Sequence, residues 1–390
     1  MDSLTTPSII QNLTQLALAN SYQIIGSDHI KIEMHEKNSE ISYDVSILIA
    51  TYNQSDYIQK AVESAVNQVS EAFRIQIIVA DDGSSCEKQL AILSRLSLQY
   101  SDVIFMGANA NMADKCISLG YPCYLANFLR LVRFSKGKYI NFLDGDDYFL
   151  HQRKILNQLK ILNACEELVV SGSISLMSNA KSTIPGKRQI KYLRKNNNIY
   201  TLDSIVSEGL QFTFHSQLFK GSLVQSALSQ LNPCVKYLDM YLLLYSLSFG
   251  QGSFSNDYGT FYRLISTSFT GSLDSSHLKL LRLQTLCGFL LARGDFISKT
   301  NRIELMSSVC RESAKIPVSV SDLSIPPSLL QDWHSAAVQL LNSYRENIDN
   351  PFFLLKRLRY LLIFCPFKML VSRLKTFKDK FLPKSRKVNF

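Results

Sequence analysis

Three short apolar runs, each followed at once by polar residues, constrain the fold of this chain more than any other feature of its sequence. Uniformly apolar runs of this length are typical of strands that are buried on both faces of a parallel sheet. Helix-forming patterns separate them, which predicts an α/β fold with a mostly parallel sheet flanked by helices. The apolar runs cover residues 45–50, 75–80 and 138–143, and the intervening helical patterns cover 57–69, 88–98 and 126–134.

The polar residues after these runs are the candidates for a functional site. They are Thr51-Tyr-Asn53, Asp81-Asp82 and Asp144-Gly-Asp146-Asp147. Ligands of open parallel sheets bind beyond the carboxyl ends of the strands, so we expect the three clusters to lie together although the sequence separates them.

The acidic cluster at 144–147 carries the clearest chemical signal. Crowded carboxylates repel one another and need a counter-charge, which a divalent cation supplies. Oxygen ligands favour Mg²⁺ or Mn²⁺, and such an ion could bridge to the phosphates of a nucleotide diphosphate. The alternative is a surface turn, because Asp and Gly are common turn residues.

Three segments together resemble the signature blocks of the family 2 glycosyltransferases, which have the GT-A fold. They are Ser46-Ile-Leu-Ile-Ala-Thr-Tyr-Asn53, Val79-Ala-Asp-Asp-Gly-Ser84 and the run from Gly137 to Tyr148. The likeness is close over about residues 44–165 and weakens towards 270. It implies an inverting transferase that uses a nucleoside-diphosphate sugar, which we expect to be UDP-linked, with Mn²⁺ or Mg²⁺.

The resemblance also implies roles for single residues. Ala50, Thr51 and Tyr52 would lie along the nucleotide, and Asp81 would accept a hydrogen bond from its base. Asp144 would face the ribose or the sugar, and Asp146 would bind the metal, while the role of Asp147 stays open. Alternatives are a turn-forming role for Asp81 and packing at the strand end for Tyr52.

A carboxylate must also remove the proton from the acceptor hydroxyl. Asp239, at the start of a predicted helix, matches the family's position for this base, although Leu238 stands where relatives carry another acid. A helix-start carboxylate that complements the helix dipole is the alternative. Relatives often have a metal-binding histidine where this chain has Ile265, and His215 is a minor acceptor-site candidate. Asn127 is predicted to be a helix N-cap.

The excess of positive charge lies at the carboxyl end. Residues 351–390 contain eleven Lys or Arg and one acid, whereas the rest of the chain is balanced. Apolar residues from Phe367 to Phe381 fall on one helical face with basic residues beside them, which favours an anionic membrane surface as partner. Docking on protein and a solvated charge run are alternatives. Nucleic acid is not expected, because no nucleic-acid fold signature accompanies the charge.

These observations predict four parts: an N-terminal extension at 1–43, a GT-A domain at 44–270, a helical region at 271–345 and a basic amphipathic tail at 346–390. Scattered cysteines and the absence of a signal-peptide pattern in residues 1–50 favour a cytoplasmic protein, peripheral on the inner face of the membrane. The acceptor is expected to be a glycan or a lipid-linked precursor of a surface polysaccharide. A non-catalytic glycan-binding or scaffolding protein is an alternative. A nucleotidyltransferase is a weaker one, because the first strand lacks a Gly-rich phosphate loop.

Overall fold

The computed structural model describes the chain as far as the long helix that ends at Arg293. The chain divides into two compact units, Met1–Ile297 and Ser298–Phe390, and every element below belongs to the first. The tail predicted at 346–390 and most of the helical region predicted at 271–345 lie outside the described residues. Those residues are 6–31, 43–68, 72–178, 183–208, 210–265 and 275–293, with single positions at 297 and 305.

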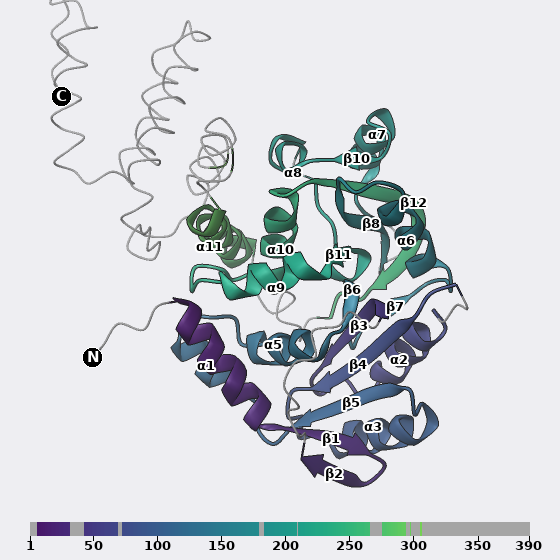
Figure 1. The fold of residues 1–390 in the computed structure, drawn as a ribbon, viewed down its shortest axis with the longest axis vertical. Coiled ribbons are helices and arrows are strands. Elements are labelled where there is room, and N and C mark those ends of the chain that lie inside the picture. The colour runs from purple at the N-terminus through teal and green to yellow at the C-terminus, as the bar shows by residue number, and fades with distance from the viewer. Residues whose placement is uncertain are drawn as a thin grey trace, which may run out of the picture. The chain divides into compact units, whose positions relative to one another are not determined.

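Four parallel strands form the centre of the sheet, in the order β6-β3-β4-β5. They are apolar and buried because helices cover both faces (Figure 1). The strands are β3 (Tyr43–Thr51), β4 (Ile75–Asp81), β5 (Val103–Ala108) and β6 (Gly137–Asp144). The predicted α/β class is confirmed; the strands at this centre are parallel, whereas the sheet as a whole is mixed, because antiparallel pairings extend it on both sides.

The helices on the two faces follow from the apolar spacing of the sequence. Helix α2 (Ile58–Val66) buries four residues spaced three or four apart: Ile58, Ala61, Val62 and Ala65. It lies with α3 (Glu87–Gln99) on one face, while α5 (Leu125–Phe134) covers the other (Figure 1).

Antiparallel strands extend the sheet beyond β6. Strand β11 (Leu218–Lys220) pairs with β6 and with β8 (Leu168–Met177), and β8 pairs in parallel with β12 (Gln251–Tyr262). The short strand β7 (Tyr148–Phe149) follows the acidic cluster and pairs with β12. This pairing brings the end of β12 next to the residues that follow β6.

The amino-terminal residues join the same sheet. After α1 (Thr6–Ala19), strand β1 (Ser21–Ile25) pairs antiparallel with β5, and β2 (Asp28–Lys31) pairs with β1. The sequence predicted an extension here with a single helical pattern, and the two edge strands were not predicted.

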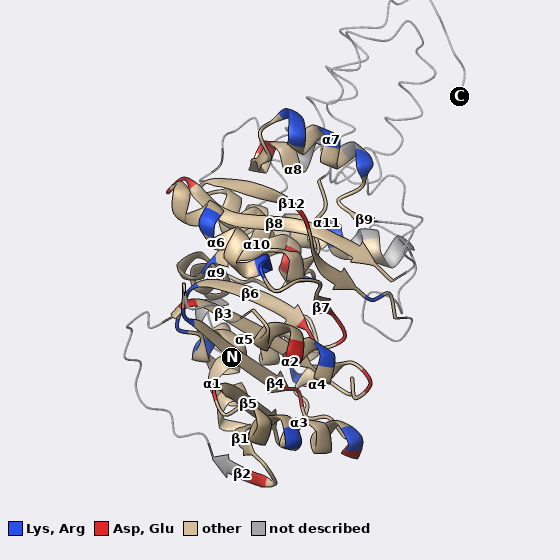
Figure 2. Cartoon of the chain, turned by 90° about the vertical axis from the view of Figure 1, so that its right-hand side faces the viewer, with Lys and Arg blue, Asp and Glu red and all other residues tan. Residues whose placement is uncertain are grey.

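Residues 187–195 are rich in Lys and Arg, and they form helix α7 (Lys187–Lys195). Lys, Arg, Gln and Leu are good helix formers, and Leu193 anchors the helix because it is fully buried. Figure 2 shows the Lys and Arg residues gathered on this helix.

None of the described helices is both long and apolar enough to span a bilayer. The five cysteines whose state the structure gives, Cys86, Cys116, Cys123, Cys165 and Cys234, are free thiols. The other elements are α4 (Ala113–Ser118), α6 (Lys154–Ala164), β9 (Thr183–Ile184), β10 (Ile199–Tyr200), α8 (Leu202–Glu208), η1 (Phe214–Ser216), α9 (Gly221–Ser229), α10 (Leu238–Leu247) and α11 (Ser275–Arg293).

Candidate active site

The carboxyl ends of β3, β4 and β6 bring the three polar clusters to one edge of the sheet. In the strand register Thr51 lies opposite Asp81, and Ala50 lies opposite Asp144. Backbone hydrogen bonds continue past the strand ends: the N–H of Gly145 donates to the Ala50 carbonyl at 2.8 Å, and that of Asp82 to Thr51 at 3.0 Å. Clusters that are distant in the sequence therefore share one rigid edge.

Asp81 is fully buried, and both of its carboxylate oxygens accept hydrogen bonds from the loop that it begins. Oδ2 accepts the Ser84 backbone N–H at 2.8 Å, and Oδ1 accepts the Ser84 hydroxyl at 2.5 Å. Gln89 donates to Oδ1 at 3.2 Å and to the Thr51 hydroxyl at 2.8 Å. Asp81 thus has the turn-forming role given above as its alternative, and its contact with a nucleotide base stays a prediction. Tyr52 is 48% exposed and does not pack at the strand end.

A buried arginine supports this part of the site from beneath. Arg130, in α5, donates to the Asp81 carbonyl at 2.7 Å and to the side-chain oxygen of Asn127. Asn127 in turn donates to the Ala80 carbonyl at 3.0 Å. The predicted N-cap role of Asn127 is wrong, because α5 begins at Leu125 and the amide is used across the interior instead. Burial raises the pKa of the Asp82 carboxyl to about 6, with Arg130 opposing the rise.

Gly145 lets the acidic loop, residues 144–147, approach the end of β3. A Cβ atom at this position would lie 2.8 Å from Thr51 Oγ1 and 2.9 Å from Thr51 Cβ. Those distances are shorter than ordinary van der Waals contact, so any larger residue would displace the loop. The glycine between two aspartates is therefore a packing requirement of this edge.

Burial and neighbouring carboxylates raise the pKa values of Asp144 and Asp146. Burial, followed by the charges of Asp146, Asp147 and Asp239, raises the pKa of Asp144 well above its usual range. Burial and then the Asp147 charge raise the pKa of Asp146 to about 6. His215 and Arg263 oppose the rise at Asp146 without cancelling it, and crowded carboxylates whose charge is only partly compensated favour a bound cation.

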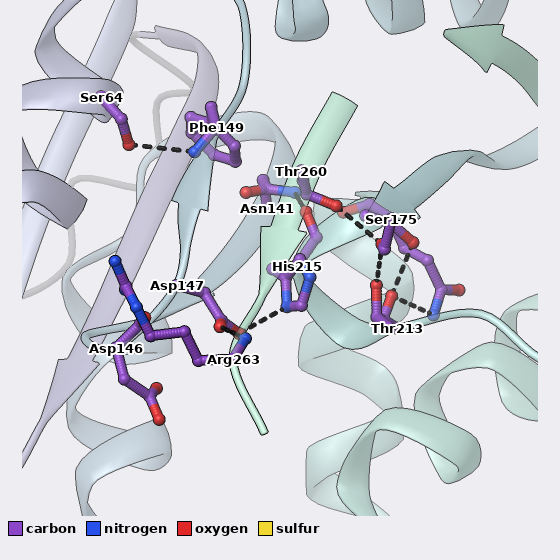
Figure 3. A network of polar contacts seen from close by, with 12 residues as sticks. Ser64, Asn141, Asp146, Asp147, Phe149, Ser175, Thr213, His215, Thr260 and Arg263 are labelled. Carbon is purple, nitrogen blue, oxygen red and sulfur yellow. Dashed lines mark hydrogen bonds and ion pairs between the residues drawn. The ribbon is translucent and has the colours of Figure 1, made fainter. Parts of the chain in front are cut away.

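Asp146 and Asp147 point in different directions, although they are adjacent in the sequence (Figure 3). Asp147 is 1% exposed, with Oδ2 lying 2.9 Å from His215 Nδ1 and Oδ1 accepting the Arg263 backbone N–H at 2.7 Å. The Arg263 guanidinium donates to the backbone carbonyl of Asp146. The Asp146 carboxylate is turned away from His215 (Figure 3). The sequence left Asp147 unassigned, and nothing in it linked residues 147, 215 and 263.

One group of side chains and one further carboxylate at this loop could hold a divalent cation. Asp144, Asp147 and His215 can offer ligand atoms that all lie within 4.8 Å of one another. His215 and Asp147 are both 1% exposed and already in contact, so that set is internal. Asp146, the ligand predicted from the sequence, lies outside that set; it is 7% exposed, and its carboxylate is turned away from His215 (Figure 3). The donor chemistry of the loop fits Mn²⁺ or Mg²⁺.

Asp239 lies in the first turn of α10, across from the acidic loop. It is half-buried, and burial raises the pKa of its carboxyl, while Arg282 and the Met240 backbone N–H oppose the rise. Its charge reaches Asp144, whose pKa it helps to raise. The structure thus brings the predicted base to the acidic loop although 95 residues of sequence separate Asp239 from Asp144.

Comparisons with known proteins agree with this geometry. Residues 46–114 match the family model described as Glycosyl transferase family 2. A solved structure of S. aureus TarS, residues 1–349 in complex with UDP-GlcNAc, is similar in fold, with a TM-score of 0.50 at 14% identity over 76% of this chain and 80% of that one. The predicted GT-A fold is confirmed.

Curated relatives are similar to less than a third of this chain. An Escherichia coli enzyme named UDP-Glc:alpha-D-GlcNAc-diphosphoundecaprenol beta-1,3-glucosyltransferase is 37% identical over 30% of this chain and 41% of its own length. A Bacillus spizizenii poly(ribitol-phosphate) beta-glucosyltransferase is 32% identical over 27% of this chain and 15% of its own length. An uncharacterised glycosyltransferase of Mycoplasma pneumoniae is 30% identical over 28% of this chain. The chain spans about a third of the length of that relative, 34%.

Proposed function

We propose that this chain, which has the GT-A fold and matches the family 2 glycosyltransferase model over residues 46–114, is an inverting glycosyltransferase. It would move a sugar from a nucleoside diphosphate, UDP in our proposal, to a hydroxyl of a glycan or lipid-linked acceptor. The observation that carries the proposal is the meeting of four elements at one sheet edge. Strand ends at Thr51, Asp81 and Asp144 form one side, and Asp239 on α10 lies across from Asp144.

The strand ends provide the donor side of the proposed site. Ala50, Thr51 and Tyr52 would lie along the nucleotide, and Tyr52 is the exposed one of them, free to contact a base or ribose. Asp81 would accept a hydrogen bond from the base, and this requires it to exchange part of its bonding to Ser84. Asp144 would face the ribose or the sugar.

Asp146 would hold a Mn²⁺ or Mg²⁺ ion on the side of the loop that faces away from His215 (Figure 3). When bound, the ion would neutralise the diphosphate and stabilise it as the leaving group. Asp144 and Asp147 add negative charge beside Asp146. That charge favours a divalent cation over a bare diphosphate, because anions repel one another at short range.

Asp239 would remove the proton from the attacking acceptor hydroxyl. A general base is most effective when its pKa lies near the working pH, and burial raises the pKa of this carboxyl towards that range. The acceptor would then lie between α10 and the acidic loop. The second acid that relatives carry before this base has no counterpart here, because Leu238 at that position is 1% exposed and packs in the core.

The acceptor class is the coarser part of the proposal. Two relatives carry names with phosphate-containing acceptors, a diphosphoundecaprenol-linked sugar and a poly(ribitol phosphate). We propose a surface-polysaccharide precursor of this kind, presented at the inner face of the membrane. The tail at 351–390, outside the described residues, would hold the enzyme there through its basic and apolar residues.

Donor binding tests the proposal directly. UDP-sugars should bind in the presence of Mn²⁺ in a calorimetric titration, and the purified protein should release UDP from one of them. Asp146→Ala should abolish the Mn²⁺-dependent part of that binding. Asp102→Ala is the matched control, because this exposed aspartate lies at the amino end of β5, on the opposite edge of the sheet.

Two outcomes would count against the proposal. Unchanged UDP affinity of Asp146→Ala in Mn²⁺ would remove Asp146 from the metal site. Binding of UDP-sugars without hydrolysis or transfer, across glycan and lipid-linked acceptors, would favour a glycan-binding or scaffolding protein instead.

A further inference from the structure

Arg263, the first residue after β12, contacts the acidic loop at two points. Its backbone N–H donates to Asp147 Oδ1 at 2.7 Å, and its guanidinium donates to the backbone carbonyl of Asp146. The contacts therefore fix two neighbouring residues of the loop, one through its carboxylate and one through its peptide group. No other described side chain is recorded as donating to the Asp146 carbonyl.

Three aromatic rings hold the Arg263 guanidinium in place. Its Cζ lies 4.6 Å from the centre of the Tyr57 ring, 5.1 Å from Tyr148 and 5.7 Å from Phe261. The Tyr148 and Phe261 rings stack on one another at 4.8 Å, which makes a rigid support. A planar guanidinium can stack on a ring and donate in its own plane at the same time, whereas a lysine ammonium cannot.

The other side of the loop is anchored in the interior. Asp147 Oδ2 lies 2.9 Å from His215 Nδ1, and both side chains are 1% exposed. The His215 carbonyl accepts hydrogen bonds from Asn141 and from the buried Lys154, each at 3.1 Å. Contacts with His215 and with the Arg263 backbone N–H thus fix Asp147, and the neighbouring Asp146 side chain points in a different direction (Figure 3).

We propose that Arg263 is a positioning residue for Asp146. It holds the Asp146 peptide group so that the carboxylate points away from Asp147 and His215, towards the proposed cation and donor diphosphate (Figure 3). The inference rests on the proposed function, because it assigns a partner to the metal-binding side chain of that site. Residues that orient a metal ligand commonly change metal affinity by about 10- to 100-fold when they are removed.

Lys60 offers a matched control within the same cluster. Its Nζ lies 3.6 Å from the centre of the Tyr148 ring, so it also stacks a cation on the ring that supports Arg263. No contact between Lys60 and residues 144–147 is recorded in the described part of the chain. Lys60→Ala therefore removes a positive charge from the cluster without removing a bond to the loop.

The test measures the Mn²⁺ affinity of the full chain, with and without UDP, from the electron paramagnetic resonance signal of free Mn²⁺. Arg263→Ala and Arg263→Lys should both raise the Mn²⁺ dissociation constant by about 10- to 100-fold, because lysine keeps the charge but not the planar donor. Lys60→Ala should leave it unchanged. The KM for Mn²⁺ in donor hydrolysis should rise in the same variants, with kcat at saturating Mn²⁺ changed less.

The melting temperature separates positioning from a purely structural role. If the Arg263 variants melt earlier but bind Mn²⁺ as the native chain does, the inference is overturned and the proposed function stands. Restoration of native Mn²⁺ affinity by Arg263→Lys would also overturn it, since charge alone would then suffice. If the native chain binds no Mn²⁺ with UDP present, the metal site of the proposed function fails and the inference falls with it.

Discussion

Replacing Gly145 by alanine would test whether the position of the acidic loop controls donor binding. The added Cβ would lie 2.5 Å from Gln54 Oε1, 2.8 Å from Thr51 Oγ1 and 2.9 Å from Thr51 Cβ. Gln54 can move its side-chain end aside. Thr51 cannot move as easily, because it is the last residue of β3 and is held by the pairing of β3 with β4.

The distances set the size of the expected effect. Ordinary contact begins at 3.4 Å, so the loop must move by about half an ångström to clear Thr51 Cβ. A misplacement of about 1 Å in a catalytic site can cost about 100-fold in rate, so half of that should cost about 10-fold. Overpacking of this kind also destabilises by about 1–3 kcal/mol, which leaves the protein folded at room temperature.

The assay is Mn²⁺-dependent release of UDP from the donor, measured together with UDP affinity and melting temperature. Gly186→Ala is the control, because a Cβ there would meet nothing within 4 Å. It should leave both activity and donor affinity unchanged. If Gly145→Ala keeps native donor affinity and native turnover, the loop does not need its close contact with Thr51, and the reasoning is refuted.

Three further changes have defined expectations. Asp239→Asn should spare donor binding and lower transfer by about 10²-fold or more. The activity of the native chain should decrease as the pH falls through the raised pKa of Asp239, and the residual activity of the variant should not show this decrease. The raised pKa of Asp82 means that its ionisation above about pH 6 costs stability. Asp82→Asn should therefore raise the free energy of unfolding by about 1–3 kcal/mol at about pH 8 and by little at about pH 4. A lower free energy of unfolding for this variant at about pH 8 would contradict the reasoning. Deleting residues 351–390 should abolish sedimentation with anionic vesicles while UDP binding persists.

The sequence was sufficient to predict the central strands, because a strand buried on both faces is written as one continuous apolar run. Residues 45–50 and 75–80 were predicted as strands, and the structure extends them only to Tyr43–Thr51 and Ile75–Asp81. The edge strands at Ser21–Ile25 and Asp28–Lys31 could not be predicted in this way. They are short and mixed in polarity, and pairing makes them strands: Ser21–Ile25 pairs with β5, about 80 residues away, and Asp28–Lys31 pairs with Ser21–Ile25.

Residues of the candidate site were predictable where they fall in a contiguous motif. Asp81, Asp144 and Asp146 follow strands directly, so the fold class alone brings them to one edge. Arg130 carries no such signal, since within α5 it reads as one basic residue on an apolar helix. Its contact with the Asp81 carbonyl joins residues that are 49 apart, and only the packing of α5 against β4 reveals it.

Asp147 shows why neighbouring acids in one motif need not share a role. Asp144 ends β6, and the Asp147 N–H donates back to its carbonyl at 2.9 Å, which closes a tight turn over Gly145 and Asp146. The turn sends Asp146 and Asp147 in different directions, and a sequence pattern gives no preference between them. The preference comes from partners elsewhere: His215 and the Arg263 N–H lie on the interior side and hold Asp147 there. Of these two neighbours, Asp146 is the one without such interior partners, and its carboxylate is therefore the one of the pair that remains for a ligand, beside that of Asp144.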